Sequence, residues 1–318
     1  GPTLPARPPL SRETGPVLSD EMRTIAAALG RTAVGVEVLA GGFSHETSLL
    51  TLADGQVVVR LGGPDPAVEA AVMAAARRHV PVPRVLAVLP GARPAMVLEY
   101  VDGTPLSQVL ADGLPDLDAL GAEVGRVAAD IGSVTFDRPG FFADAQLRVS
   151  PELPWSRQLP HVAEDCMAAT PDARLDGPTR RAWAALCTAH APALTEIDDD
   201  ARLAHADLNP KNILVSRAAG GWRVDAVLDW EFSFSGCPYG DAANMARFGA
   251  DYPDAFLDGF RAAFATRLAP PADWAYLGRV LDMFALSDLV TRPLGNPVAE
   301  RAALVIRQWV IDGVPDSP

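Results

Sequence analysis

One segment of the chain combines histidine, aspartate and asparagine at a spacing that suits chemistry on phosphates. His205, Asp207 and Asn212 follow the pattern H-x-D-x-x-x-x-N. In that pattern the aspartate can accept the proton of an attacking hydroxyl, and the asparagine carbonyl oxygen can hold a magnesium ion. The pattern often arises by chance, so its interpretation depends on the residues that follow it.

A further aspartate follows this segment at a separation that a hairpin would close. Asp229 comes after two apolar runs that Gly220-Gly221 divides. Because paired glycines favour a tight turn between strands, the chain is predicted to return and bring Asp229 beside Asn212. A base and two oxygen ligands for Mg²⁺ are what phosphoryl transfer requires, since the metal neutralises phosphate charge and the base orients the nucleophile.

Short strands dominate the part of the chain that precedes residue 102. Ser19 is predicted to cap a short helix that ends at Gly30. Asp65-Pro66 is predicted to begin a second helix, which runs to about His79. The five predicted strands cover residues 34–39, 47–52, 56–61, 82–88 and 95–101, and Asp54-Gly55 marks a hairpin turn.

Helical periodicity takes over beyond Gly103, interrupted by the segment 203–230. The predicted helices cover residues 116–132, 155–169, 178–192, 241–249, 253–268, 272–291 and 298–312. This order predicts an α+β fold of the bilobal protein-kinase type. We expect a Pro-rich tail over 1–18, a nucleotide-binding N-lobe over 19–101 whose five-stranded antiparallel sheet has one helix after its third strand, and a mostly helical catalytic and substrate-binding C-lobe over 102–318.

Composition excludes several classes of function. The chain has 318 residues and a net charge of −13, which argues against nucleic-acid binding because that rests on basic patches. No apolar run reaches the roughly 18 residues of a membrane span, and residues 1–9 lack the apolar core of a signal peptide. The three dispersed cysteines suit reduced thiols in the cytoplasm. The acidity could steer a cationic substrate or simply aid solubility.

The catalytic segment resembles that of the aminoglycoside phosphotransferase and choline kinase superfamily. Residues 205–214 are similar to its H-G-D-L-x-P-x-N-I-L, and D-W-E at 229–231 with G-C-P-Y-G-D at 236–241 are similar to its later motifs. The resemblance extends over about residues 34–290. Protein kinases would carry Arg in place of Ala206 and D-F-G in place of D-W-E, so the resemblance implies a small-molecule substrate.

The resemblance implies roles for five residues of this segment. Asp207 would be the base that positions the acceptor hydroxyl, while Asn212 and Asp229 would hold Mg²⁺. His205 would brace the loop through backbone hydrogen bonds. Asp241 would accept N–H groups of the same loop, and a plain helix N-cap is an equally good and compatible interpretation.

The resemblance also implies how a nucleotide would be bound. The backbone of Gly41, Gly42 and Ser44 would cover the phosphates, although a hairpin turn would have the same sequence. Arg60 stands where kinases usually have lysine, and its guanidinium can fork onto phosphate oxygens. Glu69 would pair with Arg60, and the alternative is an acidic residue placed in the first turn of a helix by its dipole.

The hinge and the acceptor site are less distinctive. Glu99 and Val101 would recognise adenine or guanine through their backbone, so the sequence does not separate ATP from GTP. Asp288 continues the apolar face of Leu277 and Phe284, where an acid is costly unless it faces a cationic substrate or pairs with an arginine such as Arg292. Glu231, just past Asp229, is the other candidate for contact with the acceptor.

The sequence therefore predicts an ATP- or GTP-dependent, Mg²⁺-requiring O-phosphotransferase that acts on a small, cationic molecule, as a cytoplasmic monomer or homodimer. Inactivation of an antibiotic, an aminoglycoside or a cationic peptide such as a tuberactinomycin, is the leading subtype and rests on the resemblance. The alternatives are a metabolic kinase for choline, a sugar or an amino alcohol, and a catalytically silent nucleotide-binding module.

Overall fold

The computed structural model describes residues 17–39 and 45–318. The predictions for the tail before residue 17 and for Gly41, Gly42 and Ser44 lie outside these residues. The chain divides into two compact units, Gly1–Pro66 with Val85–Tyr100 and Ala67–Arg84 with Val101–Pro318. The predicted lobe boundaries at residues 18 and 101 stay a prediction, and the division by packing differs from them in assigning residues 67–84 to the second unit.

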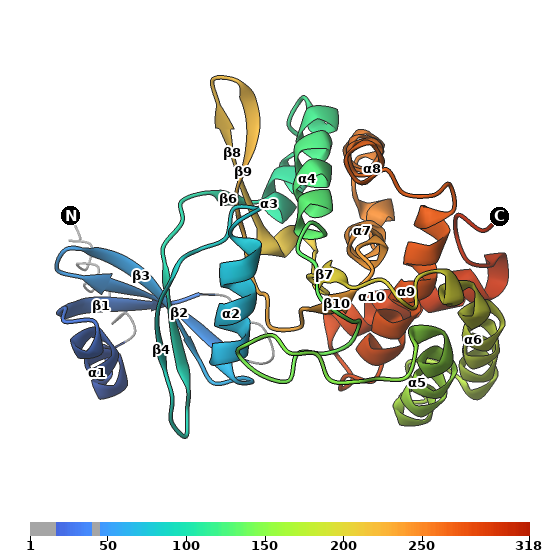
Figure 1. The fold of residues 1–318 in the computed structure, drawn as a ribbon, viewed down its shortest axis with the longest axis horizontal. Coiled ribbons are helices and arrows are strands. Elements are labelled where there is room, and N and C mark those ends of the chain that lie inside the picture. Colours follow the sequence, from blue (N-terminus) through green and yellow to red (C-terminus); the bar gives the residue numbers. More distant parts are fainter. Residues whose placement is uncertain (1–16, 40–44) are drawn as a thin grey trace, which may run out of the picture. The chain divides into compact units, whose positions relative to one another are not determined.

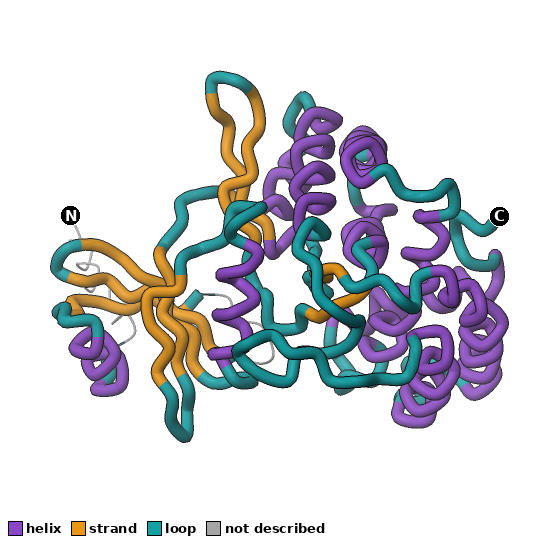
Figure 2. Tube along the Cα trace, in the orientation of Figure 1, coloured by secondary structure: helices purple, strands orange, loops and turns teal. Residues whose placement is uncertain are grey.

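The first unit is built on a five-stranded antiparallel sheet, as the alternating strand pattern predicts (Figures 1 and 2). The strand order is β1-β2-β3-β5-β4, and β3 occupies the centre between β2 and β5. The strands are β1 (Ala33–Val38), β2 (Glu46–Leu52), β3 (Gly55–Leu61), β4 (Val85–Leu89) and β5 (Ala95–Glu99).

Helix α1 (Asp20–Ala28) covers one face of this sheet. Its Ser19 side chain accepts the Met22 N–H at 3.2 Å, the N-cap predicted from the sequence. Met22 and Ile25, one helical turn apart, pack with Leu50, Val59 and other strand residues in a buried cluster. The alternation of the strands thus supplies one apolar face, and α1 removes it from water.

The second unit is mostly helical (Figure 1). Its helices are α2 (Pro66–Ala76), α3 (Leu106–Asp112), α4 (Leu117–Ile131), α5 (Trp155–Ala169), α6 (Gly177–His190), α7 (Tyr239–Ala246), α8 (Asp254–Leu268), α9 (Trp274–Leu289) and α10 (Pro297–Asp312). The sequence missed α3, a helix of seven residues too short to show a clear period. No helix among the described residues is long and apolar enough to cross a membrane.

Glycines bring α4 and α8 into direct backbone contact. A Cβ added at Gly121 or Gly125 of α4 would overlap the carbonyl oxygens of Phe256 and Phe260 in α8. Gly259 makes the reciprocal approach to the backbone of Asp118. Phe256, Phe260 and Phe264 of α8 are fully buried, so this helix pair forms part of the densely packed core of the second unit.

Two short antiparallel pairs carry the catalytic segment. Strand β7 (Arg202–Ala204) pairs with β10 (Phe234–Gly236), and it ends at the residue before His205. Strands β8 (Ile213–Ala218) and β9 (Gly221–Val227) form the hairpin expected around Gly220-Gly221, and β6 (Thr104–Pro105) adds to its edge. The turn reverses the chain so that β9 ends beside the start of β8.

Candidate active site

Asp207 is held by two amide side chains. Asn212 Nδ2 donates to Asp207 Oδ2 at 3.1 Å and to its carbonyl oxygen at 2.9 Å. Asn209 Nδ2 donates to Asp207 Oδ1 at 2.9 Å. Asn209 also caps the short 3₁₀ turn Pro210–Asn212, since its Oδ1 accepts the Lys211 N–H. The Asp207 carboxylate is thus held in place by a hydrogen-bond donor to each of its two oxygens.

His205 braces the loop in a single tautomer. The Asp207 N–H donates to Nδ1 of His205 at 3.1 Å, so the proton of the imidazole is on Nε2, which donates to the Leu228 carbonyl at 2.8 Å. The Trp230 ring packs on the imidazole with centroids 4.6 Å apart. Burial lowers the pKa of His205 to about 4, so the neutral form persists at physiological pH.

Asp241 and Asn244 of α7 clamp the peptides before Asp207. Asp241 Oδ2 accepts the His205 N–H at 2.8 Å, and its Oδ1 accepts the Ala206 N–H at 2.9 Å. Asn244 Nδ2 donates to the Ala206 carbonyl at 3.3 Å. Ala206 has a φ of 71°, a left-handed conformation that is strained for alanine. The clamp supplies hydrogen bonds that hold this strained turn.

The β8–β9 hairpin brings Asp229 next to the catalytic loop. The Leu228 N–H donates to the Asn212 carbonyl at 2.8 Å, so Asp229 follows directly on a residue paired with Asn212. Asp229 has a φ of 59°, which turns the chain out of the strand. The Trp230 N–H then donates to Glu69 Oε1 of α2 at 3.1 Å. Helix α2 therefore helps to fix the segment that carries Asp229.

Burial is the main influence on the pKa values of Asp207 and Asp241. Burial raises the pKa of Asp207 to about 6, partly opposed by the charge of Arg247 and by the Asn209 and Asn212 amides. Burial likewise raises the pKa of Asp241 to about 6 against its two N–H bonds. A carboxylate with a pKa near 6 is ionised at pH 7 and basic enough to accept a hydroxyl proton.

The donor set around Asp207 suits a hard cation. The Asn212 side chain donates both of its hydrogen bonds to Asp207 through Nδ2. Its Oδ1 can therefore act as a metal ligand. Asp229 supplies a carboxylate from the neighbouring strand end. The described residues contain no group of three or more histidine, cysteine or acidic side chains that could hold a metal. One carboxylate and one amide oxygen suit Mg²⁺, which keeps waters and phosphate oxygens as its other ligands.

The residues predicted to bind nucleotide are divided between the two units. Arg60 lies on β3 of the first unit, is buried, and its Nη2 is 3.2 Å from Nδ1 of His45. Glu99 ends β5 in the same unit, whereas Val101 and Glu69 belong to the second. Glu69 is buried and bonded to Trp230. The pairing of Glu69 with Arg60 stays a prediction.

The two acceptor candidates have different surroundings. Asp288 is 59% exposed in its side chain and pairs with Arg292 at 2.9 Å, one turn further along the chain. This is the arginine pairing that the sequence offered as the alternative to a substrate contact. Glu231 is half-buried and directly follows Trp230. Glu231 is therefore better placed near the catalytic segment than Asp288.

Sequence reasoning assigned no role to Asn209, Asn244 or Arg247. Asn209 could have been found, because an asparagine two residues after an aspartate and before a proline is typical of a local side-chain turn. Asn244 and Arg247 follow Asp241 at intervals of three residues. That spacing puts them on the face of one helix with Asp241.

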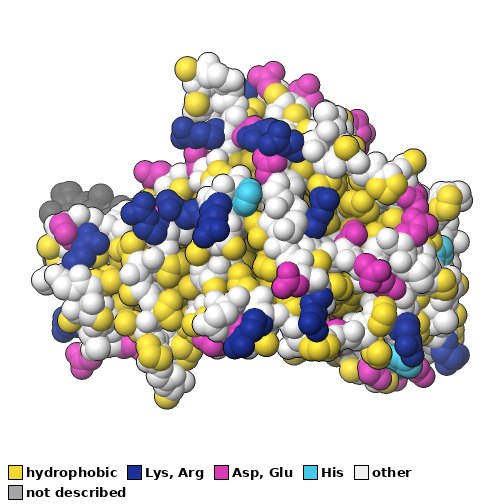
Figure 3. Space-filling view, in the orientation of Figure 1, with side chains coloured by type: hydrophobic (Ala, Val, Ile, Leu, Met, Phe, Trp, Pro, Cys, Tyr) yellow, Lys and Arg dark blue, Asp and Glu magenta, His cyan; other side chains and the backbone are white. Residues whose placement is uncertain are grey.

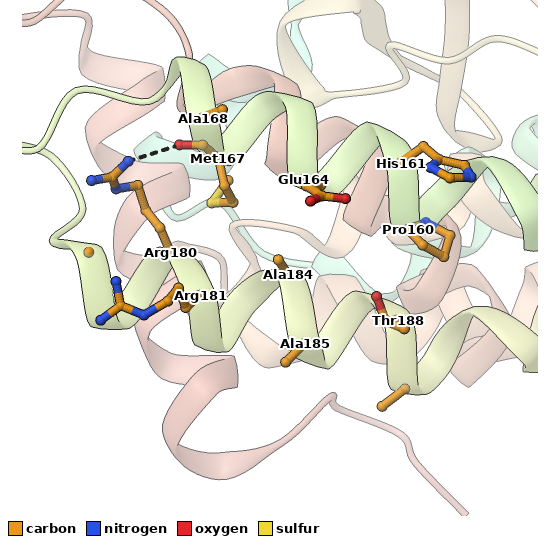
Figure 4. Close-up of a pocket in the computed structure, with 12 residues that line it drawn as sticks. Pro160, His161, Glu164, Met167, Ala168, Arg180, Arg181, Ala184, Ala185 and Thr188 are labelled. Carbon is orange, nitrogen blue, oxygen red and sulfur yellow. Dashed lines mark hydrogen bonds between the residues drawn. The ribbon is translucent and has the colours of Figure 1, made fainter.

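A separate groove lies between α5 and α6, with a volume of about 730 Å³ (Figure 4). The residues that line it include His161 and Glu164 of α5 and Arg181, Ala184 and Ala185 of α6. None of its lining residues belongs to the segment 203–230. The groove is therefore distinct from the catalytic loop.

A five-stranded antiparallel sheet, a helical unit and this catalytic loop define a phosphotransferase with a protein-kinase-like fold. A model of the phosphotransferase enzyme family (APH) matches residues 35–277. The match covers more than half of the chain, so the chain belongs to this family and is an enzyme that phosphorylates hydroxyl groups of small molecules. The resemblance inferred from the motifs is thereby confirmed. No protein of curated function matches the chain by sequence.

Solved structures confirm the fold. A thermostable mutant of aminoglycoside phosphotransferase APH(4)-Ia in a ternary complex with AMP-PNP and hygromycin B is 18% identical with a TM-score of 0.69, over 93% of this chain and 100% of that chain. The GDP complex of an aminoglycoside 2′-phosphotransferase-IIIa mutant is 17% identical with a TM-score of 0.61, over 87% and 91%. At these identities the likeness concerns the fold alone, and it confirms the predicted fold class.

Proposed function

We propose that the protein is an ATP- or GTP-dependent O-phosphotransferase that inactivates a cationic antibiotic. The observation that carries the proposal is the environment of Asp207, a buried carboxylate whose pKa is raised to about 6 and whose two oxygens accept from Asn209 and Asn212. Such a group can orient a hydroxyl and accept its proton near neutral pH.

In the proposed mechanism, Asp207 accepts the proton of the acceptor hydroxyl as its oxygen attacks the γ-phosphorus. The bond from that phosphorus to the bridging oxygen breaks, and the nucleoside diphosphate leaves. Asn212 and Asp229 are the residues that would hold Mg²⁺, which when bound neutralises charge on the phosphates. His205 and Asp241 keep the backbone of Asp207 in place through the bonds described above.

The acceptor is proposed from charge and from analogy. A net charge of −13 favours the approach of a cation. Similar structures include enzymes named for aminoglycosides, one of them crystallised with hygromycin B. Glu231 is the acidic side chain we propose to meet an amine of the acceptor. An aminoglycoside or a cationic peptide such as a tuberactinomycin would fit this description.

The first test measures release of ADP or GDP with Mg²⁺ and a panel of aminoglycosides, tuberactinomycins, choline, sugars and amino alcohols. Turnover with one cationic antibiotic class supports the proposal. Turnover with choline or a sugar alone would instead establish a metabolic kinase. Nucleotide binding without turnover of any acceptor would contradict the antibiotic assignment and favour a silent module.

The second test replaces the base. We expect Asp207→Asn to lower kcat by on the order of 10²–10⁴-fold while nucleotide affinity stays within about twofold, because the amide cannot accept the proton. Asp258→Asn, on the exposed face of α8, is the matched control and should keep its activity. Wild-type kcat in Asp207→Asn would refute the assignment of the base.

A further inference from the structure

Four rings of the second unit pack together, and we call them the aromatic cluster. The ring centroids of Phe141 and Phe234 lie 5.7 Å apart, and each lies within 5.8 Å of the Trp155 centroid. Phe284 packs edge-on against Trp155 at 6.3 Å. The four rings come from the loop between α4 and α5, the start of β10, the start of α5 and α9. Segments far apart in the sequence therefore converge on one group of rings.

Phe141 forms the open side of the aromatic cluster. It is 48% exposed, whereas Trp155 behind it is 6% exposed. Among the phenylalanines and tryptophans that the structure describes, only Phe141 and Phe232 are exposed. A half-exposed ring that packs on two other rings leaves part of its apolar surface in water, and covering that surface with a ligand is favourable.

The backbone on both sides of Phe141 is fixed to neighbouring segments. The Gly140 N–H donates to the Ser235 carbonyl at 2.8 Å, and the Ser235 N–H donates back at 3.0 Å. The Phe141 carbonyl accepts the Ser150 N–H at 3.0 Å. A Cβ added at Gly140 would lie 2.6 Å from the Ser150 carbonyl oxygen, so this approach requires glycine. The ring is thus presented on an ordered backbone, and a preorganised group loses little entropy when it binds a ligand.

The aromatic cluster lies beside the catalytic loop. Phe234 is the strand partner of Ala204, and Ser233 Oγ donates to the His205 carbonyl at 3.2 Å. Strand partners have Cα atoms about 5 Å apart, and three residues span at most about 11 Å. The Cα atoms of Phe234 and Asp207 are therefore at most about 16 Å apart. A small molecule of several rings can extend over this distance.

Ring chemistry and charge together indicate the kind of group that the aromatic cluster would bind. The face of an aromatic ring attracts cations, and a flat conjugated cation such as a guanidinium can also stack on it. The net charge of −13 favours cations as well. Glu231, which we propose as the partner of an acceptor amine, lies three residues before Phe234. These features fit a flat cation better than a neutral sugar.

We propose that the aromatic cluster is a subsite for a flat, conjugated cationic group of the acceptor, with Phe141 and Phe234 as its stacking surface. This inference rests on the proposed function and narrows its acceptor class. The subsite selects the acceptor and takes no part in the transfer of the phosphoryl group. Loss of the Phe141 ring should therefore raise the KM for the acceptor and leave kcat nearly unchanged.

Binding of small cations tests the subsite without knowledge of the acceptor. Benzamidine is a flat, conjugated cation, and cyclohexylmethylamine is a cation of similar size without a flat face. By ligand-observed NMR we expect benzamidine to bind wild type about fivefold more tightly than cyclohexylmethylamine, and Phe141→Ala to lose about fivefold in benzamidine affinity. Equal affinities for the two cations, no measurable binding of benzamidine, or wild-type affinity in Phe141→Ala would each overturn the inference.

Three variants serve as controls. Phe141→Tyr keeps the ring and should bind benzamidine within twofold of wild type, whereas Phe141→Leu keeps an apolar side chain without the ring and should resemble Phe141→Ala. Wild-type affinity in Phe141→Leu would refute stacking, and this variant decides if Phe141→Ala does not unfold cooperatively. Leu304→Ala removes an apolar side chain from α10 at a residue that is 63% exposed. An equal loss of affinity there would also refute the subsite.

Turnover separates this inference from the proposed function. With the acceptor that the panel identifies, we expect Phe141→Ala to raise KM by about fivefold or more, with kcat within about threefold and nucleotide Kd within about twofold of wild type. Asp207→Asn should lose turnover yet bind benzamidine like wild type. Full turnover in Asp207→Asn would refute the proposed function, whereas wild-type benzamidine affinity and KM in Phe141→Ala would refute only the subsite.

Discussion

At the residue scale, the catalytic loop depends on a histidine that must stay neutral. Nδ1 of His205 accepts the Asp207 N–H, and Nε2 donates to Leu228. Protonation of Nδ1 would replace an acceptor by a donor facing another donor. The imidazole thus connects the backbone of Asp207 to the strand end before Asp229, and this connection is sensitive to acid.

The depressed pKa of His205 has a calculable effect on stability. The folded state stays neutral down to about pH 4, whereas an unfolded histidine takes up a proton below about pH 6.5. The unfolded state therefore binds more protons between these values, and stability falls as the pH falls through this window. Between pH 7.5 and 5 this amounts to about 2 kcal/mol.

Urea unfolding of wild type and His205→Asn at pH 7.5 and at pH 5 tests this effect. The buried aspartates titrate in both proteins, so their contribution to the pH dependence cancels when the two stabilities are compared. We expect the stability advantage of wild type over His205→Asn to shrink by about 2 kcal/mol from pH 7.5 to 5. A constant difference for His205→Asn would contradict the prediction.

At the element scale, the second unit relies on helices that approach to backbone contact. Gly121 and Gly125 of α4 face carbonyl groups of α8, and Gly278 of α9 faces the start of α7. The first pair of helices forms a buried, aromatic-rich part of the unit. The second pair includes α7, whose Asp241 and Asn244 bond to the backbone of the catalytic loop. Small residues at these contacts determine how closely the helices approach.

Gly121→Ala should strongly destabilise the protein. The new methyl group would overlap the Phe256 carbonyl, and backbone cannot move away as the end of a side chain can. We expect the free energy of unfolding to fall by about 2–3 kcal/mol, measured by chemical denaturation. Alanine is otherwise the better helix former, so the expected loss has to come from the overlap.

Gly240→Ala, in the first turn of α7, provides the control. A Cβ there would meet Leu281 at 3.6 Å, an ordinary van der Waals contact. We expect unchanged or higher stability, by up to about 1 kcal/mol, because the helix gains an alanine. Similar losses in Gly121→Ala and Gly240→Ala would refute the role of backbone contact between α4 and α8.

At the scale of the whole molecule, we expect the net charge to influence how a cationic acceptor would approach the protein. The net charge is −13, and both acidic and basic side chains occupy the face drawn in Figure 3. The field that a distant cation experiences therefore depends on the sum of many charges. Such long-range attraction is screened over about 8–10 Å at physiological salt.

Ionic strength should therefore distinguish the proposed acceptors. For a cationic acceptor we expect kcat/KM to fall by about three- to tenfold between 50 and 300 mM NaCl, as the attraction is screened. A neutral acceptor of the same reaction serves as the control and should change by less than twofold. Equal salt dependence for both would indicate that the acidity of the protein serves solubility only.

The parts of the fold that local patterns specify were predictable. Helix α5 has the predicted bounds, and Ser19 caps α1 as expected. The five strands lie within a few residues of their predicted positions because alternation and turn residues act over short distances. The H-x-D-x-x-x-x-N loop was equally visible, since Asp207 and Asn212 bond to each other across a single turn. Spacing along the chain was sufficient for these features.

The partners that side chains find far along the chain were determined only by the tertiary structure. Glu69 reaches Trp230 across 161 positions of sequence, and Arg247 reaches Asp282 across 35. Asp288, which the sequence left between a substrate contact and an arginine pair, lies exposed beside Arg292. Sequence periodicity gives the face on which a residue lies, but the element packed against that face depends on the balance of burial and close contact over the whole chain.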